Sequence, residues 1–407
     1  MQCGLLGEKL GHSYSPLIHN ALADYSYKLF ETEKHNLENF LKTGTFSGVN
    51  VTIPYKKAVI PYLSELSPVA RKLGSVNTIV RRDNGQLVGH NTDYFGFKTM
   101  VERCGVSPAG KKALVLGSGG ASNTVVAVLE EMGAQVVVIS RTGANNYDNL
   151  HLHQDAAILV NTTPVGMYPN VGIAPVSLSL FPHLEYVLDI IFNPARTQLL
   201  LDAEKLGVPT MNGLLMLVAQ AKESAEWFTG KAIDDSQIDA IYRKLKADTE
   251  NIFLIGMPGC GKSTIGMLLS QALNRPFVDA DAKIAEAAEM DIPSIFAKFG
   301  ESRFREIETD VLRKLGKGSA QVIATGGGCV TRGINYGPMH QNGKIIWIRR
   351  SIEALPTEGR PLSQSNNLQD MYTQRMPLYK AFSDAVIDND GIPEDALAQI
   401  LSLLEEA

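Results

Sequence analysis

Cysteine is scarce in this chain of 407 residues, and the four cysteines stand far apart. They are Cys3, Cys104, Cys260 and Cys329, and no two of them form a CxxC pair. Zinc sites and disulfide scaffolds both depend on closely spaced or paired cysteines, so the sequence argues against both classes. Isolated thiols suit a reducing compartment, and we expect a cytoplasmic protein.

Long apolar runs and long basic runs are also missing. No stretch approaches the roughly 20 apolar residues that cross a membrane, and the first residues lack the basic end and apolar run of a signal peptide. Lysine and arginine number 38 against 43 acidic residues, are spread along the chain and leave a net charge of −5. A nucleic acid needs a basic face, so we expect neither nucleic acid nor a membrane as a partner.

What is present is an ordinary globular composition, with 44% apolar and 20% charged residues. At about 150 residues per domain, the length predicts two or three domains. Two glycine-rich loops, at residues 117–121 and 256–264, divide the chain. Each lies between a strand-like run and a helical pattern, which is the context of a phosphate-binding loop. We therefore predict an α/β fold with parallel sheets.

Strand-like and helical runs alternate along much of the chain. We expect strands near residues 48–52, 75–80, 113–116, 135–140, 157–161, 186–191, 252–255 and 322–325, and helices near 124–132, 213–227, 265–273 and 282–290. A polar helical segment is predicted to end at Lys246. Residues 247–250 would then form a short linker, and we place a domain boundary there.

The first glycine loop, Gly117-Ser118-Gly119-Gly120-Ala121, suits the pyrophosphate of a dinucleotide. A glycine turn at a helix N-terminus offers backbone N–H groups to an anion, although a purely structural turn explains the loop equally well. The next strand ends in Ser140-Arg141-Thr142, where an NAD-binding fold usually has an acidic residue. Because a cation there suits a 2′-phosphate, we infer NADP rather than NAD. The alternative for Arg141 is a solvated surface arginine.

Three polar clusters precede that loop, at residues 11–16, 50–56 and 91–93. Ser13 and Ser15 lie beside a turn and could hold a small anion. Lys56 and Asp93, if they face one substrate, could bind a hydroxyl group and move its proton. The plainer alternatives are a surface lysine and an aspartate that caps a helix or turn.

The second glycine loop satisfies GxxxxGK[ST] in full from Gly256 to Thr264. This pattern is typical of a nucleoside triphosphate site, where backbone N–H groups cradle the phosphates. Lys262 would reach the β- and γ-phosphates, and the Ser263 hydroxyl would bind Mg²⁺. Cys260 within the loop is explained more simply as a small filler than as a reactive thiol.

Paired carboxylates follow the next predicted strand, at Asp279 and Asp281. On an extended segment, side chains two residues apart point the same way. One carboxylate could help hold Mg²⁺ and the other could deprotonate an acceptor hydroxyl; the alternative is a helix N-cap. Arg305, Arg360 and Arg375 recur at turn-like positions, where their planar guanidinium groups suit carboxylates and phosphates. Glycines at 326–328 allow a backbone to approach a ligand closely.

Residues 1 to about 246 resemble the shikimate dehydrogenase family. The resemblance rests on the motifs HSYSP, NVTIPYK, SVNT, HNTD, GSGGA, SRT and NGLLMLVAQ, in this order. It implies that 3-dehydroshikimate is reduced to shikimate with NADPH. It also implies an α/β substrate domain at 1–104 and 211–247, and an NADP-binding Rossmann domain at 105–210.

The same resemblance implies roles for individual residues. Lys56 and Asp93 would be the catalytic pair, and Ser13 and Ser15 would hold the substrate carboxylate. The ring hydroxyls would be bound by Thr52, Asn77 and Gln220, with Asp93. The NADP site would be lined by Gly117, Ser118, Gly119, Gly120, Ala121, Arg141, Thr142, Ile190 and Gly213.

Residues 250–407 resemble the shikimate kinase family, on the motifs GxxGCGKST, DAD, FREIE, TGGG, RPL and QRMPLY. The resemblance implies a parallel-sheet P-loop domain, like that of nucleoside monophosphate kinases, which phosphorylates shikimate with ATP. Asp281 would be the base, and Asp279 and Ser263 would support Mg²⁺. Shikimate would be held by Arg305, Gly327 and Arg375, with Asp281. The nucleotide would contact Gly259, Cys260, Gly261, Lys262, Ser263 and Thr264, and Lys262 and Arg360 would meet the transferred phosphoryl group.

The sequence departs from both families in places. Phe192 replaces a common tyrosine, and no second basic residue follows Arg141. The kinase-like part lacks an adenine-side arginine at 351–359 and another at 388–391, so we expect weaker ATP binding. Two alternatives stay open: a kinase-like regulatory nucleotide-binding module, and a quinate/shikimate dehydrogenase that uses NAD. In all these cases the partners are small molecules, and the oligomeric state is not specified.

Overall fold

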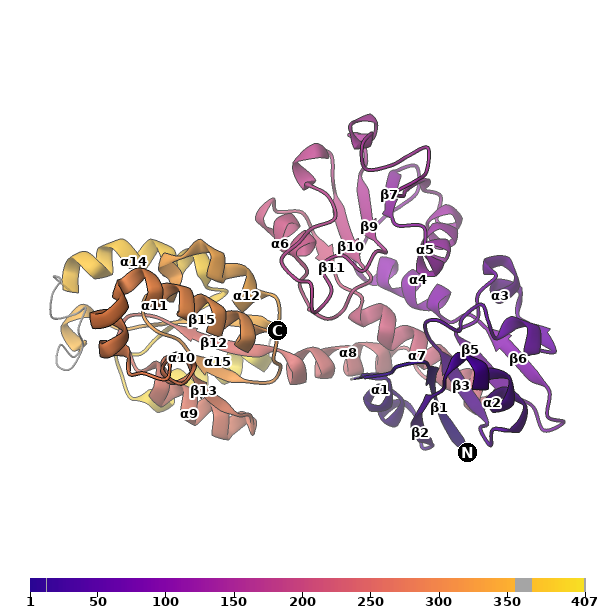
Figure 1. Cartoon of the computed structure of the whole chain (residues 1–407), viewed down its shortest axis with the longest axis horizontal. Helices are drawn as coiled ribbons and strands as arrows, with labels where there is room; N and C mark the ends of the chain where they lie inside the picture. The colour runs from indigo at the N-terminus through magenta and orange to yellow at the C-terminus, as the bar shows by residue number, and fades with distance from the viewer. Residues whose placement is uncertain (12, 356–367, 406–407) are drawn as a thin grey trace. The chain divides into compact units, whose positions relative to one another are not determined.

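The structure is a computed structural model of the chain, and it describes residues 1–11, 13–355 and 368–405 (Figure 1). The chain divides into two compact units. The first contains Met1–Phe192 and Asp202–Lys244, and the second contains Asn193–Leu201 and Leu245–Ala407. Residues 193–201, which the sequence places in the Rossmann segment, thus group with the second unit.

The first unit starts with a six-stranded mixed sheet in the order β2-β1-β3-β5-β6-β4. Its strands are β1 (Gln2–Gly7), β2 (Ser26–Glu31), β3 (Gly48–Val51), β4 (Glu65–Leu66), β5 (Thr78–Arg81) and β6 (Leu87–His90), and its helices are α1 (Ser15–Leu22), α2 (Leu37–Thr43), α3 (Pro68–Leu73) and α4 (Asp93–Arg103). Strand β1 runs parallel to β2 and β3, whereas β5 is antiparallel to β3 and β6. The strand predicted from residue 75 starts at Thr78, because Gly74 ends α3 in a left-handed conformation and residues 75–77 connect the two.

A second sheet in the same unit is wholly parallel, in the order β11-β10-β9-β7-β8. Its elements are β7 (Lys112–Leu116), α5 (Gly120–Glu131), β8 (Gln135–Ile139), β9 (Ile158–Asn161), β10 (Tyr186–Asp189), α6 (Gln198–Lys205) and β11 (Thr210–Met211). Strand β7 is buried almost throughout, as expected for a strand covered on both faces. Because β8 and β9 lie on opposite sides of β7, its C-terminal end is a topological switch point, which is the place where such folds bind ligands.

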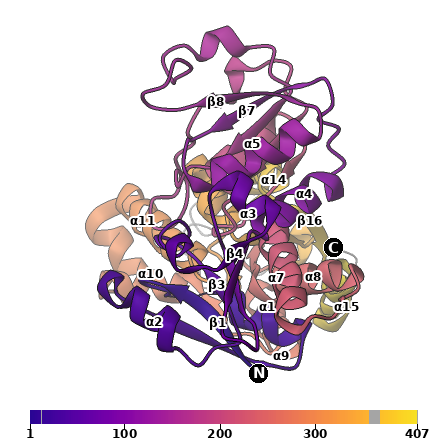
Figure 2. The same cartoon turned by 90° about the vertical axis from the view of Figure 1, so that its right-hand side faces the viewer.

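Helix α7 (Leu214–Thr229) returns the chain from the second sheet to the first part of the unit, where it packs against α1 and α4 (Figure 2). Helix α8 (Ser236–Thr249) follows. The predicted linker at 247–250 is wrong for most of its length, because α8 continues to Thr249. The Glu250 amide donates to the Lys246 carbonyl at 3.1 Å, so the helical hydrogen-bond pattern continues to the end of α8.

The second unit contains a five-stranded parallel sheet in the order β13-β14-β12-β15-β16. Its strands are β12 (Asn251–Ile255), β13 (Phe277–Asp279), β14 (Val322–Ala324), β15 (Gly343–Arg349) and β16 (Ala385–Asp388). Its helices are α9 (Lys262–Leu273), α10 (Ala280–Ala288), α11 (Ile292–Gly316), α12 (Tyr336–His340), α14 (Leu368–Phe382) and α15 (Pro393–Glu405). The predicted α/β class with parallel sheets is confirmed. Strands β14 and β15 flank the buried β12, so its C-terminal end is again a topological switch point.

Two further features bear on the expectations from composition. None of the helices in the described part of the chain is long and apolar enough to span a membrane. All four cysteines are unpaired thiols, and Cys3, Cys260 and Cys329 are buried.

Candidate functional sites

Lys56 and Asp93 are brought together from different elements of the first unit. Lys56 follows β3, and Asp93 opens α4, where a negative charge is favoured by the helix dipole. The Lys56 ammonium lies 2.6 Å from Oδ2 of Asp93, and the two side chains are 30% and 15% exposed. The pair is therefore partly shielded from water, yet still reachable by a small molecule.

Asn77 holds the other oxygen of the Asp93 carboxylate. Its Nδ2 donates to Oδ1 of Asp93 at 3.0 Å and also lies 3.4 Å from Oε1 of Gln220 on α7. Its Oδ1 accepts a hydrogen bond from the Thr92 amide at 2.7 Å. Four residues that the sequence singles out (Lys56, Asn77, Asp93 and Gln220) thus form one connected polar cluster.

A second set of buried polar groups extends this cluster, and the sequence analysis missed it. Asn50 accepts from Tyr27 at 2.7 Å and donates to Ser224 at 2.8 Å. The Ser224 hydroxyl lies 2.9 Å from that of Thr92, and Tyr27 also contacts Ser15. A signal was available, since Asn50 and Thr92 lie within NVTIPYK and HNTD, and Ser224 is one helical turn beyond Gln220.

Ser13 and Ser15 lie at the start of α1, where the Ser15 amide donates to the Ser13 hydroxyl at 3.2 Å. Ser15 is buried and Ser13 is half-buried. Thr52 is half-buried directly after β3, with its amide bonded to the Leu6 carbonyl. Each of these three hydroxyl groups therefore sits at the end of a regular element.

A half-buried acid, Glu223, lies on α7 near the cluster. The pKa of Glu223 is raised to about 7, first by burial and next by the charge of Glu226, with a further contribution from Asp93. Its partner Trp227 stacks on the imidazole of His90, with ring centroids 3.6 Å apart. Burial lowers the pKa of His90 to about 4, so this ring is neutral near pH 7.

The first glycine loop leads from β7 into α5, as the sequence predicts. Gly117 has φ +105°, a left-handed conformation that favours glycine. Ser118, Gly119 and Gly120 are exposed, and a Cβ atom added at either of the two glycines would meet nothing within 4 Å. Ala121 is half-buried in the first turn of α5. Open space over backbone N–H groups at a helix N-terminus fits a pyrophosphate.

The other predicted dinucleotide contacts surround this loop on the same sheet. Gly213 approaches β10 so closely that a Cβ atom there would lie 2.0 Å from the Ile190 carbonyl oxygen. Arg141 and Thr142 follow β8 and are both exposed. Phe192, which takes the place of a tyrosine, packs on Tyr14 with ring centroids 5.6 Å apart.

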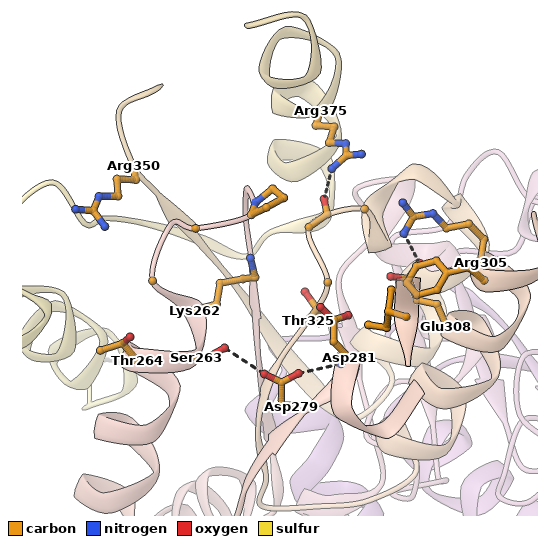
Figure 3. Close-up of a pocket in the computed structure, with 18 of the residues that line it drawn as sticks. Lys262, Ser263, Thr264, Asp279, Asp281, Arg305, Glu308, Thr325, Arg350 and Arg375 are labelled. Carbon is orange, nitrogen blue, oxygen red and sulfur yellow. Dashed lines mark hydrogen bonds and ion pairs between the residues drawn. The ribbon is translucent and has the colours of Figure 1, made fainter. Parts of the chain in front are cut away.

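In the second unit, a cavity of about 460 Å³ opens beside the second glycine loop (Figure 3). That volume is sufficient for a small ligand. The predicted residues that line it are Gly259, Gly261, Lys262, Ser263, Thr264, Asp279, Asp281, Arg305, Gly327 and Arg375. Cys260 is fully buried beneath the loop, where only its backbone can face a ligand. Arg360 lies outside the described residues.

Lys262 and Ser263 begin helix α9. The Lys262 ammonium donates to the carbonyls of Gly256 and Met257, both at 2.9 Å, and lies 3.9 Å from the Cys260 sulfur, so the loop itself holds the ammonium in place. The Ser263 hydroxyl lies 3.2 Å from Oδ2 of Asp279. A hydroxyl oxygen and a carboxylate oxygen at this separation form a donor set that suits Mg²⁺.

The expectation of an extended Asp279–Asp281 segment is wrong. Asp279 ends β13 and caps α10, because its Oδ1 accepts the amides of Asp281 and Ala282. Asp281 therefore lies in the first turn of a helix. Its Oδ1 is buried without a partner among the described residues, and its pKa is raised by burial and by the charge of Asp279. The N-cap alternative is correct for Asp279, which also faces Ser263.

Arg305 is held by two acidic side chains of its own helix, α11. Its Nη1 bonds Glu308 at 2.9 Å, and its Nε and Nη2 bond Glu301 at 3.2 and 3.1 Å. Gly328 permits this placement, because a Cβ atom there would lie 2.1 Å from Nη2. Glu308 is 1% exposed and its pKa is raised by burial. The sequence analysis quoted FREIE but missed that its second glutamate, at i+3, positions the arginine.

Arg375 approaches the same end of the cavity from α14. Its Nη1 donates to the Gly327 carbonyl at 3.2 Å, and the Tyr379 hydroxyl donates to the same oxygen. Figure 3 places Arg305, Glu308 and Asp281 together on one side of Lys262. This side of the cavity, which we call the acceptor end, combines carboxylate and guanidinium groups, which suit a small polar molecule.

The two sites define a two-part enzyme. A polar pair joined to a dinucleotide-type sheet is the arrangement of a dehydrogenase, and a phosphate loop beside a carboxylate and two arginines is that of a P-loop kinase. Residues 5–79 match the family model of the shikimate dehydrogenase substrate binding domain, and residues 258–405 match that of shikimate kinase.

Known proteins agree with this division. The shikimate dehydrogenase (NADP(+)) of Clostridium perfringens strain ATCC 13124 is 38% identical over 265 residues, covering 60% of this chain and 97% of the relative. A chorismate mutase/shikimate 5-dehydrogenase fusion protein from Clostridium acetobutylicum is 37% identical, with a TM-score of 0.58 and coverage of 60% and 97%. Shikimate 5-dehydrogenase from Thermus thermophilus, in complex with NADP(H) and shikimate, is 32% identical, with a TM-score of 0.55 and coverage of 60% and 99%. The chain therefore belongs to the shikimate dehydrogenase family, and it carries a shikimate kinase domain at its C-terminal end.

Proposed function

We propose that this chain catalyses two consecutive reactions of the shikimate pathway. The first unit reduces 3-dehydroshikimate to shikimate with NADPH, and the kinase domain then transfers the γ-phosphoryl group of ATP to the 3-hydroxyl of shikimate. The observation that carries the proposal is the occurrence in one chain of the connected Lys56–Asp93–Asn77–Gln220 cluster and the cavity that joins the phosphate loop to Asp281 and Arg305.

In the first reaction, NADPH supplies the hydride when it is bound. As negative charge develops on the substrate oxygen, the Lys56 ammonium stabilises it and donates the proton. Asp93 holds the ammonium in place, and Asn77 fixes the orientation of the carboxylate. Thr52, Asn77 and Gln220 bind the ring hydroxyls, and Ser13 and Ser15 bind the substrate carboxylate.

The dinucleotide binds along the second sheet of the first unit. The loop Gly117–Ala121 receives the pyrophosphate, Arg141 and Thr142 bind the 2′-phosphate, and Ile190 and Gly213 contact the nicotinamide end. The exposure of Arg141 supports this assignment, since an exposed guanidinium at the end of β8 can form charge-assisted bonds with a phosphate.

In the second reaction, Asp281 accepts the proton of the shikimate hydroxyl as it attacks the γ-phosphorus. The raised pKa of Asp281 supports this role, because a base works best when its pKa approaches the working pH. Arg305 and Arg375 bind shikimate beside Gly327. Arg360 meets the transferred phosphoryl group with Lys262, and the backbone from Gly259 to Thr264 cradles the phosphates. Ser263 and Asp279 hold Mg²⁺, which neutralises the phosphate charge when it is bound.

A coupled assay tests both activities. Folded protein supplied with 3-dehydroshikimate, NADPH and MgATP should consume NADPH and yield shikimate 3-phosphate, measured by absorbance and mass spectrometry. Supplying shikimate and MgATP alone isolates the kinase step. ATP binding without ADP production from shikimate would contradict a catalytic kinase and favour the regulatory module. Faster oxidation of NADH than of NADPH would favour the NAD-dependent alternative.

We place the enzyme in the cytoplasm. Its four cysteines are unpaired thiols, as suits a reducing compartment, and both reactions use nucleotides that are abundant there. Fractionation of cells that produce the full chain would test this placement.

A further inference from the structure

Arg350 directly follows β15 and lines the same cavity as the phosphate loop, although no motif discussed above includes it. Compared with the pattern of the family it resembles, the kinase domain lacks two adenine-side arginines, at residues 351–359 and 388–391. A cation within this cavity is therefore relevant to nucleotide binding.

The residues on both sides of Arg350 are tied to the end of β16 and to the segment that follows it. Arg349 forms two bonds with the Asp388 carboxylate, at 2.6 and 2.8 Å, and the Ser351 amide donates to Asp390 at 2.7 Å. Successive side chains of an extended segment point to opposite faces. Arg349 is exposed on one face, so Arg350 points to the other face, where it lines the cavity.

The residue directly after β16 is attached to the phosphate loop. Asn389 Nδ2 donates to the Cys260 carbonyl at 2.8 Å, and Asn389 is 4% exposed. Asp388 thus holds Arg349, Asn389 holds the phosphate loop and Asp390 holds Ser351. The acidic segment that lacks an arginine therefore positions the residues around Arg350. The position of Arg350 relative to the loop is fixed by these bonds.

Arg350 also keeps a free hydrogen-bonding group. Its Nε is shielded from solvent and has no hydrogen-bond partner within the described ranges. In contrast, Arg305 is bonded to Glu301 and Glu308, and Arg375 donates to Gly327. A desolvated donor of this kind is unfavourable until a ligand supplies the acceptor.

Figure 3 shows which end of the site Arg350 serves. Its side chain lies on the same side of Lys262 as Thr264, and Arg305, Glu308 and Asp281 lie on the other. The acceptor end contains Arg305 and Arg375, whereas Arg350 is the arginine labelled at the Thr264 end. A cation at this end faces the part of a nucleoside triphosphate that lies beyond the β- and γ-phosphates.

We propose that Arg350 is a nucleotide-binding residue, which contacts the adenosine 5′-phosphate end of ATP and substitutes for the adenine-side arginines that the sequence lacks. The assignment rests on the proposed kinase function. It predicts that Arg350 contributes to the affinity for ATP and ADP but not to that for shikimate.

Calorimetric titration of the full chain tests this assignment with ADP and shikimate as separate ligands. Arg350→Met keeps most of the apolar stem, Arg350→Lys keeps the charge, and Arg303→Ala is a matched control, because Arg303 is exposed and pairs with Glu306. The loss of a charge-assisted bond predicts that Arg350→Met weakens ADP binding about 10- to 100-fold. Arg350→Lys should lie between Arg350→Met and the wild type, and shikimate affinity should stay within about twofold.

The outcomes distinguish a failure of the Arg350 assignment from a failure of the proposed kinase function. If the wild-type chain binds ADP and Arg350→Met binds it equally well, the assignment of Arg350 is wrong and the kinase function stands. The assignment is also wrong if Arg350→Met weakens shikimate binding as much as ADP binding, or if Arg303→Ala weakens ADP binding as much as Arg350→Met does. If the wild-type chain binds no ADP, the proposed kinase function itself fails. Thermal melting of each variant shows whether a loss of affinity reflects a loss of folding.

Discussion

The Lys56 ammonium and the Asp93 carboxylate lie 2.6 Å apart at the junction of β3 and α4. Asn77 bonds the second carboxylate oxygen, so Asp93 can hold the lysine in only a narrow range of directions. Thr92 and Gln220 in turn fix Asn77. The proton donor that we propose for ketone reduction is therefore oriented by side chains from three different parts of the chain.

Lys56→Met should abolish most of the dehydrogenase activity and leave the kinase activity intact. Removing a positioned proton donor costs about 10²- to 10⁴-fold in rate. The measurement is NADPH oxidation with 3-dehydroshikimate, together with ADP production from shikimate. Lys57→Met is the matched control, since Lys57 is adjacent and exposed. Unchanged NADPH oxidation in Lys56→Met would remove Lys56 from the mechanism.

Arg141→Ala should change the cofactor preference. The loss of charge-assisted bonds to a 2′-phosphate predicts that the KM for NADPH rises roughly 10- to 100-fold, whereas the KM for NADH, which has no such phosphate, stays constant. Steady-state kinetics with both cofactors measure this difference. Arg82→Ala, an exposed arginine paired with Glu65, serves as the control. Equal effects on both cofactors would mean that Arg141 does not bind the 2′-phosphate.

Asp281→Asn should stop phosphoryl transfer without weakening nucleotide binding. An amide cannot accept the hydroxyl proton, so kcat should fall about 10²- to 10⁴-fold. ADP affinity should be preserved, because Asp281 lies at the acceptor end of the cavity. Asp310→Asn, at an exposed position paired with Arg313, is the control. If kcat falls by less than about tenfold, Asp281 is not the base.

Glu223→Gln should remove a pH dependence of stability from the first unit. In the folded chain the pKa of Glu223 is raised from 4.5 to about 7, so the native state binds this proton more tightly than the unfolded state. The stabilisation is complete below pH 4.5 and is lost as the pH rises through 7. The shift corresponds to at most about 3 kcal/mol.

Thermal melting between pH 4.5 and 8 tests this expectation. The wild-type melting temperature should fall relative to that of Glu223→Gln as the pH rises, and the exposed Glu102→Gln should follow the wild type. A constant difference between wild type and Glu223→Gln across this range would show that Glu223 does not titrate there.

Much of the architecture could be predicted because it depends on local patterns. The apolar runs before 117 and 256 predict buried parallel strands, and the glycine loops predict the helices that follow. Errors arose where local hydrogen bonds decided the geometry. Asp279 caps α10 and thereby places Asp281 in its first turn. Helix α8 likewise continues through most of the predicted linker by its own backbone bonds.

The sequence by itself determined the identity and order of the motifs, and with them the fold class and both families. A motif is contiguous, so its residues are near one another in any fold. Only the tertiary structure decided which residues meet across elements: Asn77 with Asp93 and Gln220, Arg305 with Gly328, and Arg350 with the phosphate loop. Such contacts depend on sheet order and helix packing, which place residues as far apart in sequence as Asn50 and Ser224, 174 positions, within hydrogen-bonding distance.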